Sequence, residues 1–247
     1  MKSLALGMKH NYENTQDFNF ITRTLHATRY KKLVALIKKI SPSHKTLRVV
    51  DVGCGPAKAY EVISGLGIEF TYFGVELRKD FSDIAKARYG ENRNFKVVCD
   101  SIENVYEVFD SADLIIGLET FEHIPDSLVV KTIEAISKSN FSYLYITVPN
   151  EVGPAILVKN LGSFLMGYVR HAEYSWRETI WAATYKLDNV ERHGVNHKGF
   201  DWRWLAHTLR QNCRIQETTT SPISIIPKFI SPSIGFVCYK DVSILDK

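Results

Sequence analysis

VVDVGCGPA, at residues 49–57, is the most informative segment of this chain for predicting its fold. It begins as a run of branched apolar residues, which favours a β-strand, and it ends in Gly53-Cys54-Gly55. Glycines at this place let the backbone turn sharply and approach a ligand that a Cβ would exclude. Many α/β proteins have such a turn, so the loop alone does not name the ligand. A dinucleotide-binding loop would have a third glycine at position 58, where this chain has Lys58.

Further strands follow this one at regular intervals, and an acidic residue stands at the end of each. The first four predicted strands are LRVVDVG, FTYFGVEL, FKVVCD and ADLIIGLE, and their terminal acids are Asp51, Glu76, Asp100 and Glu119. Helical stretches separate these strands, which predicts a parallel sheet with helices on both faces. In such a sheet the four carboxylates lie along one edge, where open α/β folds bind ligands.

The remaining pattern predicts how the sheet is completed. A fifth strand, SYLYITVPN, is followed after an insertion by a helix over 202–212 and by two closing strands, RIQETTT and SIGFVCYK. At 247 residues the chain is long enough to bury one full core. We therefore expect a single α/β domain with seven strands. Its expected parts are an N-terminal helical region (1–45), a core (46–150), an insertion (151–200) and a closing helix with strands (201–247).

Composition and charge exclude some functional classes. The net charge is +4, but Lys and Arg are scattered rather than massed in one block, so a nucleic-acid partner is not indicated. The four cysteines form no C-x-x-C pair, and the N-terminus has no sustained apolar core typical of a secretory signal. The longest apolar-rich stretch, 152–169, is broken by Lys159, Asn160 and two glycines. We expect a cytoplasmic protein with reduced thiols and no membrane-spanning helix.

VVDVGCGPA, GVEL, CDSIE and GLETFEHIPD together resemble the class I S-adenosylmethionine-dependent methyltransferases. The resemblance is strongest over residues 28–150 and implies a Rossmann-like, doubly wound and mostly parallel sheet with S-adenosyl-L-methionine as cofactor. It implies that the glycine loop accommodates the methionine part and that Glu76 accepts hydrogen bonds from both ribose hydroxyls, which suits an ionised carboxylate. The residues implied to contact the cofactor are Asp51, Gly53, Cys54, Gly55, Glu76, Leu77, Asp100, Ser101, Ile102, Leu118 and Glu119. For Asp51, burial as a structural carboxylate is an equal alternative.

A group of titratable residues follows the fourth strand. Glu119, Glu122 and His123 have i, i+3, i+4 spacing, which predicts that they share one face of a helical turn. Methyl transfer to an alcohol must deal with the hydroxyl proton, through either a histidine base or a cation that stabilises the alkoxide. Two carboxylates and an imidazole suit most of a Mg²⁺ or Mn²⁺ site, without the thiolates of structural zinc. His197, in GVNHKGFDW, could supply the fourth ligand.

The pattern E-x-x-E-H with a later H-x-x-x-D-W resembles two metal-dependent branches of the family. These are the ubiquinone-type catechol O-methyltransferases and the small-RNA 3′-terminal 2′-O-methyltransferases. The resemblance implies a divalent cation held by Glu119, Glu122, His123 and His197 that grips adjacent acceptor oxygens. Two alternatives stay open: His123 or His197 acts as a catalytic base without metal, or the group is purely structural, since an E-H pair occurs here in metal-free relatives.

The insertion after the fifth strand should contact the acceptor, because insertions at this place cover the pocket in the family. A stripe of Leu157, Leu161, Phe164, Leu165 and Tyr168 predicts either a lid helix packed on the core or a membrane contact through 154–169. Trp176, Trp181 and Tyr185 could stack on the acceptor or pack within the lid. Arg29 and Tyr30 stand where related enzymes often contact the cofactor's carboxylate, but we expect them on an exposed helix face.

The preferred function is methylation of a hydroxyl on a small molecule or glycan, which could be lipid-linked, with help from a base or a divalent metal. One alternative is an RNA 2′-O-methyltransferase, which the absence of a basic patch interleaved with aromatics disfavours. Another is a non-catalytic protein that binds the cofactor or a partner, which the complete series of strand-end acids disfavours. The sequence leaves the oligomeric state open.

Overall fold

The computed structural model describes residues 20–165, 174–192, 197–222 and 225–240. Its centre is a seven-stranded sheet in the order β3-β2-β1-β4-β5-β7-β6, in which β7 runs antiparallel to its two neighbours. The predicted α/β class and the mostly parallel seven-stranded sheet are therefore confirmed. The strands are β1 Leu47–Val52, β2 Phe70–Glu76, β3 Phe95–Cys99, β4 Leu114–Leu118, β5 Tyr143–Pro149, β6 Arg214–Ser221 and β7 Ser233–Tyr239.

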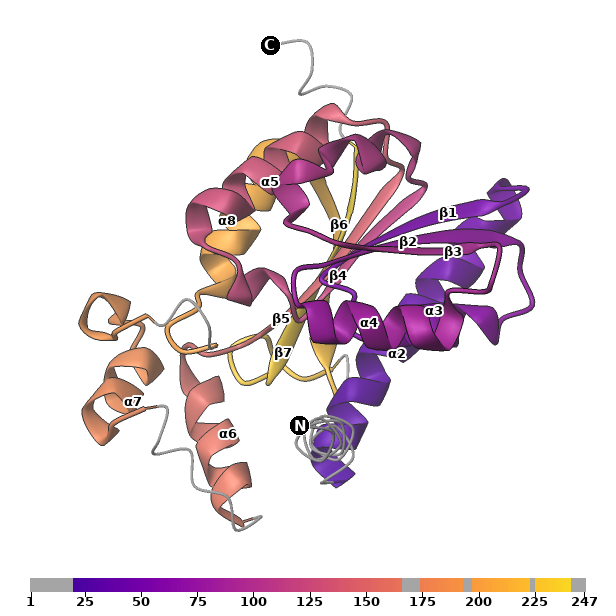
Figure 1. Ribbon diagram of the computed structural model, residues 1–247. Helices are drawn as coiled ribbons and strands as arrows, with labels where there is room; N and C mark the ends of the chain where they lie inside the picture. The colour runs from indigo at the N-terminus through magenta and orange to yellow at the C-terminus, as the bar shows by residue number, and fades with distance from the viewer. Residues whose placement is uncertain (1–19, 166–173, 193–196, 223–224, 241–247) are drawn as a thin grey trace, which may run out of the picture.

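Helices cover both faces of this sheet (Figure 1). One face packs against α5 (Asp126–Lys138) and α8 (Trp202–Asn212), whose buried residues join Val50, Ile115 and Ile146 in one core cluster. The other face packs against α2 (Phe20–Ile40), α3 (Lys58–Ser64) and α4 (Lys79–Tyr89). The strands alternate their side chains between two apolar layers, so both faces need cover.

Two further helices lie beyond the end of β5 and project away from the sheet (Figure 1). They are α6 (Pro154–Leu165) and α7 (Trp176–Ala183). Their buried residues form a small cluster separate from the two main layers: Ile156, Tyr174, Ala182 and Val190. No helix in the described ranges is long and apolar enough to cross a membrane.

The strand order reverses between β1 and β4, which brings the ends of these two strands together. Gly53 and Gly55, after β1, have positive φ values of 69° and 54°, which glycine adopts without strain. A Cβ on Gly53 would lie 2.2 Å from the side chain of Thr120, in the turn after β4. The glycine loop therefore packs directly on the turn that leads to Glu122 and His123. Such a switch point is where open α/β sheets bind ligands.

Candidate functional site

The glycine loop is held by Glu76, the last residue of β2. Glu76 is 7% exposed; its Oε2 accepts a hydrogen bond from the Gly55 amide and its Oε1 one from the Arg78 amide, each at 2.8 Å. A carboxylate oxygen has more than one lone pair, so both oxygens can still accept from a ligand hydroxyl. The next side chain, Leu77, is 72% exposed, which leaves an apolar surface beside this carboxylate.

The end of β3 lies beside Glu76 and completes this part of the edge. The amide of Asp100 donates to the Glu76 carbonyl at 3.2 Å, and the Asp100 carboxylate accepts from Asn104 Nδ2 and the Ser101 amide. These two hydrogen bonds, the one from Asn104 first, lower the pKa of Asp100 and keep it ionised. Ile102 is buried beneath. Exposed Leu77 between two carboxylates suits an adenosine, which has an apolar face and polar edges.

Two of the residues predicted to contact the cofactor turn their side chains inward. A Cβ on Gly74 would lie 2.6 Å from Cys54 Sγ, so the thiol points under the loop against β2. Asp51 is 3% exposed and accepts a 2.5 Å hydrogen bond from the Tyr72 hydroxyl. Burial raises the pKa of Asp51 to about 7, although the Tyr72 bond partly opposes the shift. The Asp51 carboxylate is therefore buried against Tyr72 of β2.

Asp51→Asn should stabilise the folded protein at alkaline pH. The folded-state pKa of Asp51, about 7, lies above its ordinary value of 3.8. The wild-type protein therefore loses stability as the pH rises from 3.8 to about 7, and this loss remains at higher pH. A neutral Asn that still accepts from Tyr72 avoids that loss, on the order of 4 kcal/mol at pH 8.5 and near zero at pH 4. Urea unfolding at both pH values measures this.

The matched control for this prediction is Asp113→Asn. Burial alone would raise the pKa of Asp113, but its hydrogen bonds with Arg48 outweigh burial and lower it. Its ionised form therefore stabilises the fold above pH 4, and the Asn variant should be less stable at pH 8.5. Equal pH dependence of the wild-type and Asp51→Asn proteins would contradict the assignment of Asp51.

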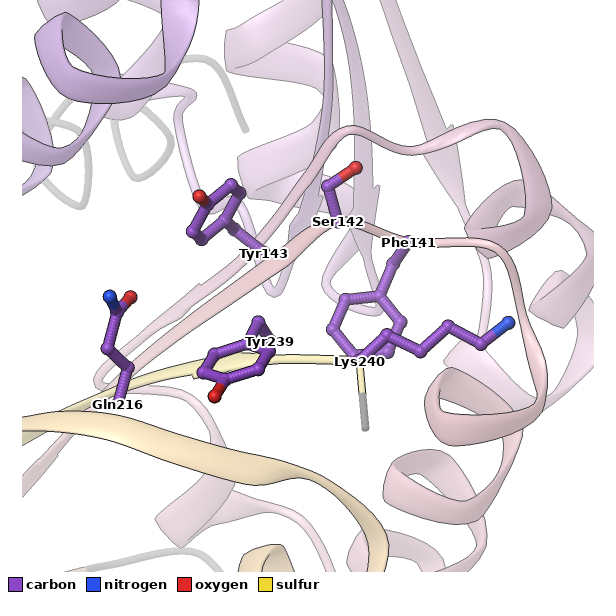
Figure 2. Close-up of a pocket in the computed structure, with 6 residues that line it drawn as sticks. All are labelled: Phe141, Ser142, Tyr143, Gln216, Tyr239 and Lys240. Carbon is purple, nitrogen blue, oxygen red and sulfur yellow. The ribbon is translucent and has the colours of Figure 1, made fainter. Parts of the chain in front are cut away.

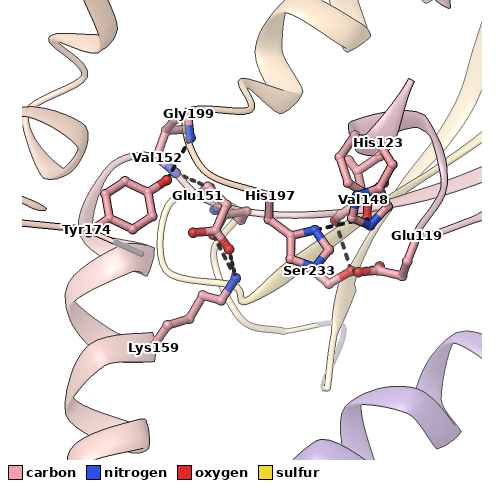
Figure 3. A network of polar contacts seen from close by, with 12 residues as sticks. Glu119, His123, Val148, Glu151, Val152, Lys159, Tyr174, His197, Gly199 and Ser233 are labelled. Carbon is pink, nitrogen blue, oxygen red and sulfur yellow. Dashed lines mark hydrogen bonds and ion pairs between the residues drawn. The ribbon is translucent and has the colours of Figure 1, made fainter. Parts of the chain in front are cut away.

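Glu122, His123 and His197 come together at the end of β4. One ligand-type atom from each lies within 4.8 Å of the others. Glu122 Oε1 is 3.3 Å from His197 Nδ1 and 3.8 Å from His123 Nε2, and the two imidazole centroids are 4.6 Å apart. The Glu122 side chain is fully buried, whereas those of His123 and His197 are 40% and 38% exposed. Figure 3 shows the two imidazoles side by side. Because a catalytic role is proposed for them below, we call these three residues the catalytic cluster.

The buried carboxylate in this cluster is poorly compensated. Within the described residues neither oxygen of Glu122 has a partner in hydrogen-bond geometry. Burial raises the pKa of Glu122 to about 7; proximity to His197 opposes the shift and the charge of Glu119 adds to it. Burial would lower the pKa of His197, but Glu122 outweighs it and raises that pKa. A buried carboxylate with two imidazoles as charged or polar neighbours is a donor set that fits a divalent cation or a shared proton.

Glu119 does not lie where its spacing predicted. Glu122 and His123 belong to a 3-10 turn (η4, Phe121–His123), whereas Glu119 precedes it with a left-handed φ of 55°. The three side chains therefore do not share one face of a helical turn, and that prediction is wrong. Glu119 Oε1 instead accepts from Ser233 Oγ at 2.9 Å (Figure 3). Ser233, at the start of β7, was not predicted, because no motif marks a serine so far away in the sequence.

The N-terminal helix contributes a buried cation. Arg29 is 8% exposed, and its Nε has no hydrogen-bond partner among the described residues. The preceding Thr28 donates to the carbonyl of Pro222 at 3.4 Å, so this part of α2 lies near the end of β6. The expectation that Arg29 lies on an exposed helix face is therefore wrong.

The apolar stripe of α6 does not pack on the core in its described members. Leu157, Leu161 and Phe164 are 49%, 59% and 69% exposed, while the side chain of Leu165 and all of Tyr168 lie outside the described residues. On the other side of the helix Lys159 pairs with Glu151, which is fully buried (Figure 3).

The aromatics of the following segment divide into two groups. Trp176 is 65% exposed, whereas Trp181 packs against the small α6–α7 cluster. Tyr185 lies against Gly153 and beneath the guanidinium of Arg203.

A hollow of about 440 Å³ opens at the opposite end of the sheet (Figure 2). It lies where β5 begins and β7 ends, and none of the residues predicted to bind the cofactor or metal lines it. The lining residues are Phe141, Ser142, Tyr143, Gln216, Tyr239 and Lys240. It is therefore separate from the site described above.

Comparison with known proteins places the chain in a family. A family model described as "Methyltransferase domain" matches residues 25–218. The ubiquinone biosynthesis O-methyltransferase of Bradyrhizobium diazoefficiens is 24% identical over 64% of this chain and 65% of its own length. The enzyme of the same name from Coxiella burnetii is 26% identical over 71% of this chain and 77% of its own.

Solved structures show the same fold. The methyltransferase domain of bacterial CtHen1-CN has a TM-score of 0.60 at 15% identity, covering 87% of this chain and 99% of that chain. Magnesium protoporphyrin IX methyltransferase from Synechocystis PCC 6803, with bound S-adenosylhomocysteine (SAH), has a TM-score of 0.57 at 11% identity, covering 90% and 88%. The family model covers most of the sequence, and the loop, Glu76 and Leu77 fit an adenosine. This chain therefore belongs to the methyltransferase-domain family and is an S-adenosylmethionine-dependent methyltransferase.

Proposed function

We propose that this enzyme methylates a hydroxyl oxygen of a small-molecule or glycan acceptor, and that a divalent cation bound by the catalytic cluster assists the transfer. The observation that carries the proposal is the buried Glu122 carboxylate, which lacks a hydrogen-bond partner among the described residues and faces His123 and His197. The curated relatives named O-methyltransferases support oxygen as the methylated atom. Glu119, whose charge already affects Glu122, is the proposed fourth ligand.

The chain's own residues have distinct roles in this proposal. Glu76 binds the ribose hydroxyls, and Leu77 and Ile102 border the adenine. The backbone at Leu118 and Glu119 meets the amino-acid end, and Arg29 is a buried cation available to the carboxylate. When bound, Mg²⁺ or Mn²⁺ would hold neighbouring acceptor oxygens and lower the pKa of the hydroxyl.

With a cation bound, both imidazoles would be ligands and the hydroxyl proton would leave to solvent; without a cation, a histidine of the cluster takes the proton. His123 and His197 are both partly exposed, so either imidazole can meet an acceptor that enters from the α6–α7 side. If no cation binds, the same imidazoles remain as general bases, with Glu122 orienting His197 through their 3.3 Å contact.

We further propose that the acceptor approaches over an exposed apolar surface and is lipid-linked. Beyond the exposed stripe of α6, two other apolar side chains are exposed: Trp176, on the neighbouring helix α7, and Phe229. Phe229 lies beside α6, because its carbonyl accepts a hydrogen bond from the amide of Ala155 at the start of that helix. A surface of this kind suits contact with a bilayer through 154–169.

One experiment tests the acceptor class and the metal together. Purified protein is incubated with methyl-labelled S-adenosylmethionine and crude small-molecule, lipid or RNA fractions, with and without EDTA, followed by added Mg²⁺ or Mn²⁺. We expect label in the lipid or small-molecule fraction, loss of at least tenfold with EDTA, and recovery with the cation. Label only in RNA would overturn the acceptor, and label unaffected by EDTA would leave the histidines as bases without metal.

A further inference from the structure

The segment that carries His197 is attached to α7 by a buried ion pair. Lys198, the next residue, is 7% exposed, and its Nζ lies 2.7 Å from Glu178 Oε1. The side chains of this pair are 8% and 15% exposed, which is far more buried than a typical surface pair. A buried ammonium without a counter-charge is strongly unfavourable, so this contact restrains where the segment can lie.

Glu178 is itself fixed by the start of α7. Its other oxygen, Oε2, accepts from the amide and the hydroxyl of Ser175 at 2.9 and 2.8 Å, which closes a capping box around the first turn. The carboxylate that holds Lys198 therefore has little freedom to follow it. Any movement of the first turn of α7 has to move Lys198 or break the pair.

A second contact joins the same two segments. The amide of Gly199 donates to the Tyr174 hydroxyl at 2.8 Å, and both groups are buried. Tyr174 is 1% exposed and belongs to the small cluster of α6 and α7, and its ring lies 5.7 Å from Lys198 Nζ. Figure 3 shows Tyr174 and Gly199 meeting on one side of His197, with Glu119 and His123 on the other.

His197 is therefore held between two separately packed parts of the molecule. Towards the sheet it meets Glu122, which belongs to the turn after β4. On the side of α6 and α7, the next two residues, Lys198 and Gly199, contact Glu178 and Tyr174. A misplacement of about 1 Å at a catalytic group can lower a reaction rate on the order of 10²-fold.

We propose that the Glu178–Lys198 ion pair and the Tyr174–Gly199 hydrogen bond are positioning contacts, which hold His197 opposite Glu122 and make assembly of the catalytic cluster depend on the α6–α7 unit. The inference rests on the role proposed above for His197. It gives α7 a role in positioning His197, which no motif in the α7 sequence indicates. In this proposal Glu178, Lys198 and Tyr174 act through His197.

The test compares three variants with the wild-type full-length protein. Glu178→Gln removes the charge but not the shape, Tyr174→Phe removes only the hydroxyl, and the double variant Glu178→Gln/Lys198→Met removes the ion pair without leaving a buried unpaired charge. Glu191→Gln, an exposed glutamate in the same connection, is the matched control. The ¹⁵N-histidine spectrum reports His197, whose signal is identified by its loss in His197→Gln.

Glu178→Gln and Tyr174→Phe should shift or broaden the His197 signal and lower kcat by about tenfold or more. The dissociation constant for S-adenosylmethionine should stay within twofold. The double variant should regain thermal stability but not the wild-type His197 signal, and Glu191→Gln should change neither. An unchanged His197 signal in Glu178→Gln and Tyr174→Phe would overturn the inference. Absence of methyl transfer by the wild-type protein would instead count against the proposed function, because the spectrum needs no turnover.

Discussion

Glu122→Gln is expected to lower kcat for methyl transfer by about 10²–10⁴-fold, the range for loss of acid–base assistance, because Glu122 is proposed to hold the cation and to orient His197. The substitution removes the negative charge that would hold a cation and that now faces His197 Nδ1 at 3.3 Å. It keeps the shape of the side chain, so the surrounding core need not rearrange. The loss should appear in kcat, measured with labelled cofactor and saturating acceptor.

Loss of folding cannot produce the same result in this variant. Burial raises the pKa of Glu122 to about 7, which means that the ionised form costs stability near neutral pH. A neutral glutamine avoids this cost, so the melting temperature of Glu122→Gln should be equal to or above that of the wild-type. The matched control is Glu134→Gln, an exposed acid on α5, which should retain full activity. If the Glu122→Gln variant turned over as fast as the wild-type protein, the proposed role of the catalytic cluster would be wrong.

Glu76→Gln should weaken S-adenosylmethionine binding by about 10- to 100-fold, the loss expected when hydrogen bonds to a charged acceptor are removed. The two carboxylate oxygens already accept from the amides of Gly55 and Arg78. A glutamine has only one oxygen, so its NH₂ group would face one of those amide N–H groups, donor against donor. The substitution therefore weakens both the ribose contact and the glycine loop.

Calorimetry with S-adenosylmethionine measures this effect directly. Asp80→Asn is the matched control, because Asp80 is an exposed acid four residues further on, whose ion pair with Arg78 lies outside the proposed ribose site. Its dissociation constant should stay within twofold of the wild-type value. If Glu76→Gln bound the cofactor as tightly as the wild-type does, the adenosine would have to lie elsewhere on the sheet.

Much of the fold could be predicted because it depends on local pattern. Each strand is a short apolar run, each is followed by a turn or a helical stretch, and parallel strands place their terminal acids on one edge whatever the details of packing. Glu76 and Asp100 accordingly lie beside each other, joined by the Asp100 amide and the Glu76 carbonyl. The side-chain direction of Asp51 was less predictable, because the pattern set only its position near the end of β1.

The candidate site was predicted in its residue types but not in its geometry. The i, i+3, i+4 spacing assumes helical backbone throughout, and the left-handed φ of Glu119 breaks that assumption at a single residue. The partner of Glu119, Ser233, comes from β7, more than a hundred residues away. No local rule predicts such a contact, because it depends on which strand neighbours β5 in the finished sheet.

Local patterns in the sequence suffice to predict the sheet, its cofactor edge and the acidic and imidazole groups beside it, because hydrophobic periodicity and strand-end residues act through near neighbours. The contact of His197 with Glu122, the burial of Arg29 and the ion pair of Lys198 with α7 arise only when the whole chain has folded. These contacts join segments that are distant in sequence, and their geometry follows from how complete layers pack against one another.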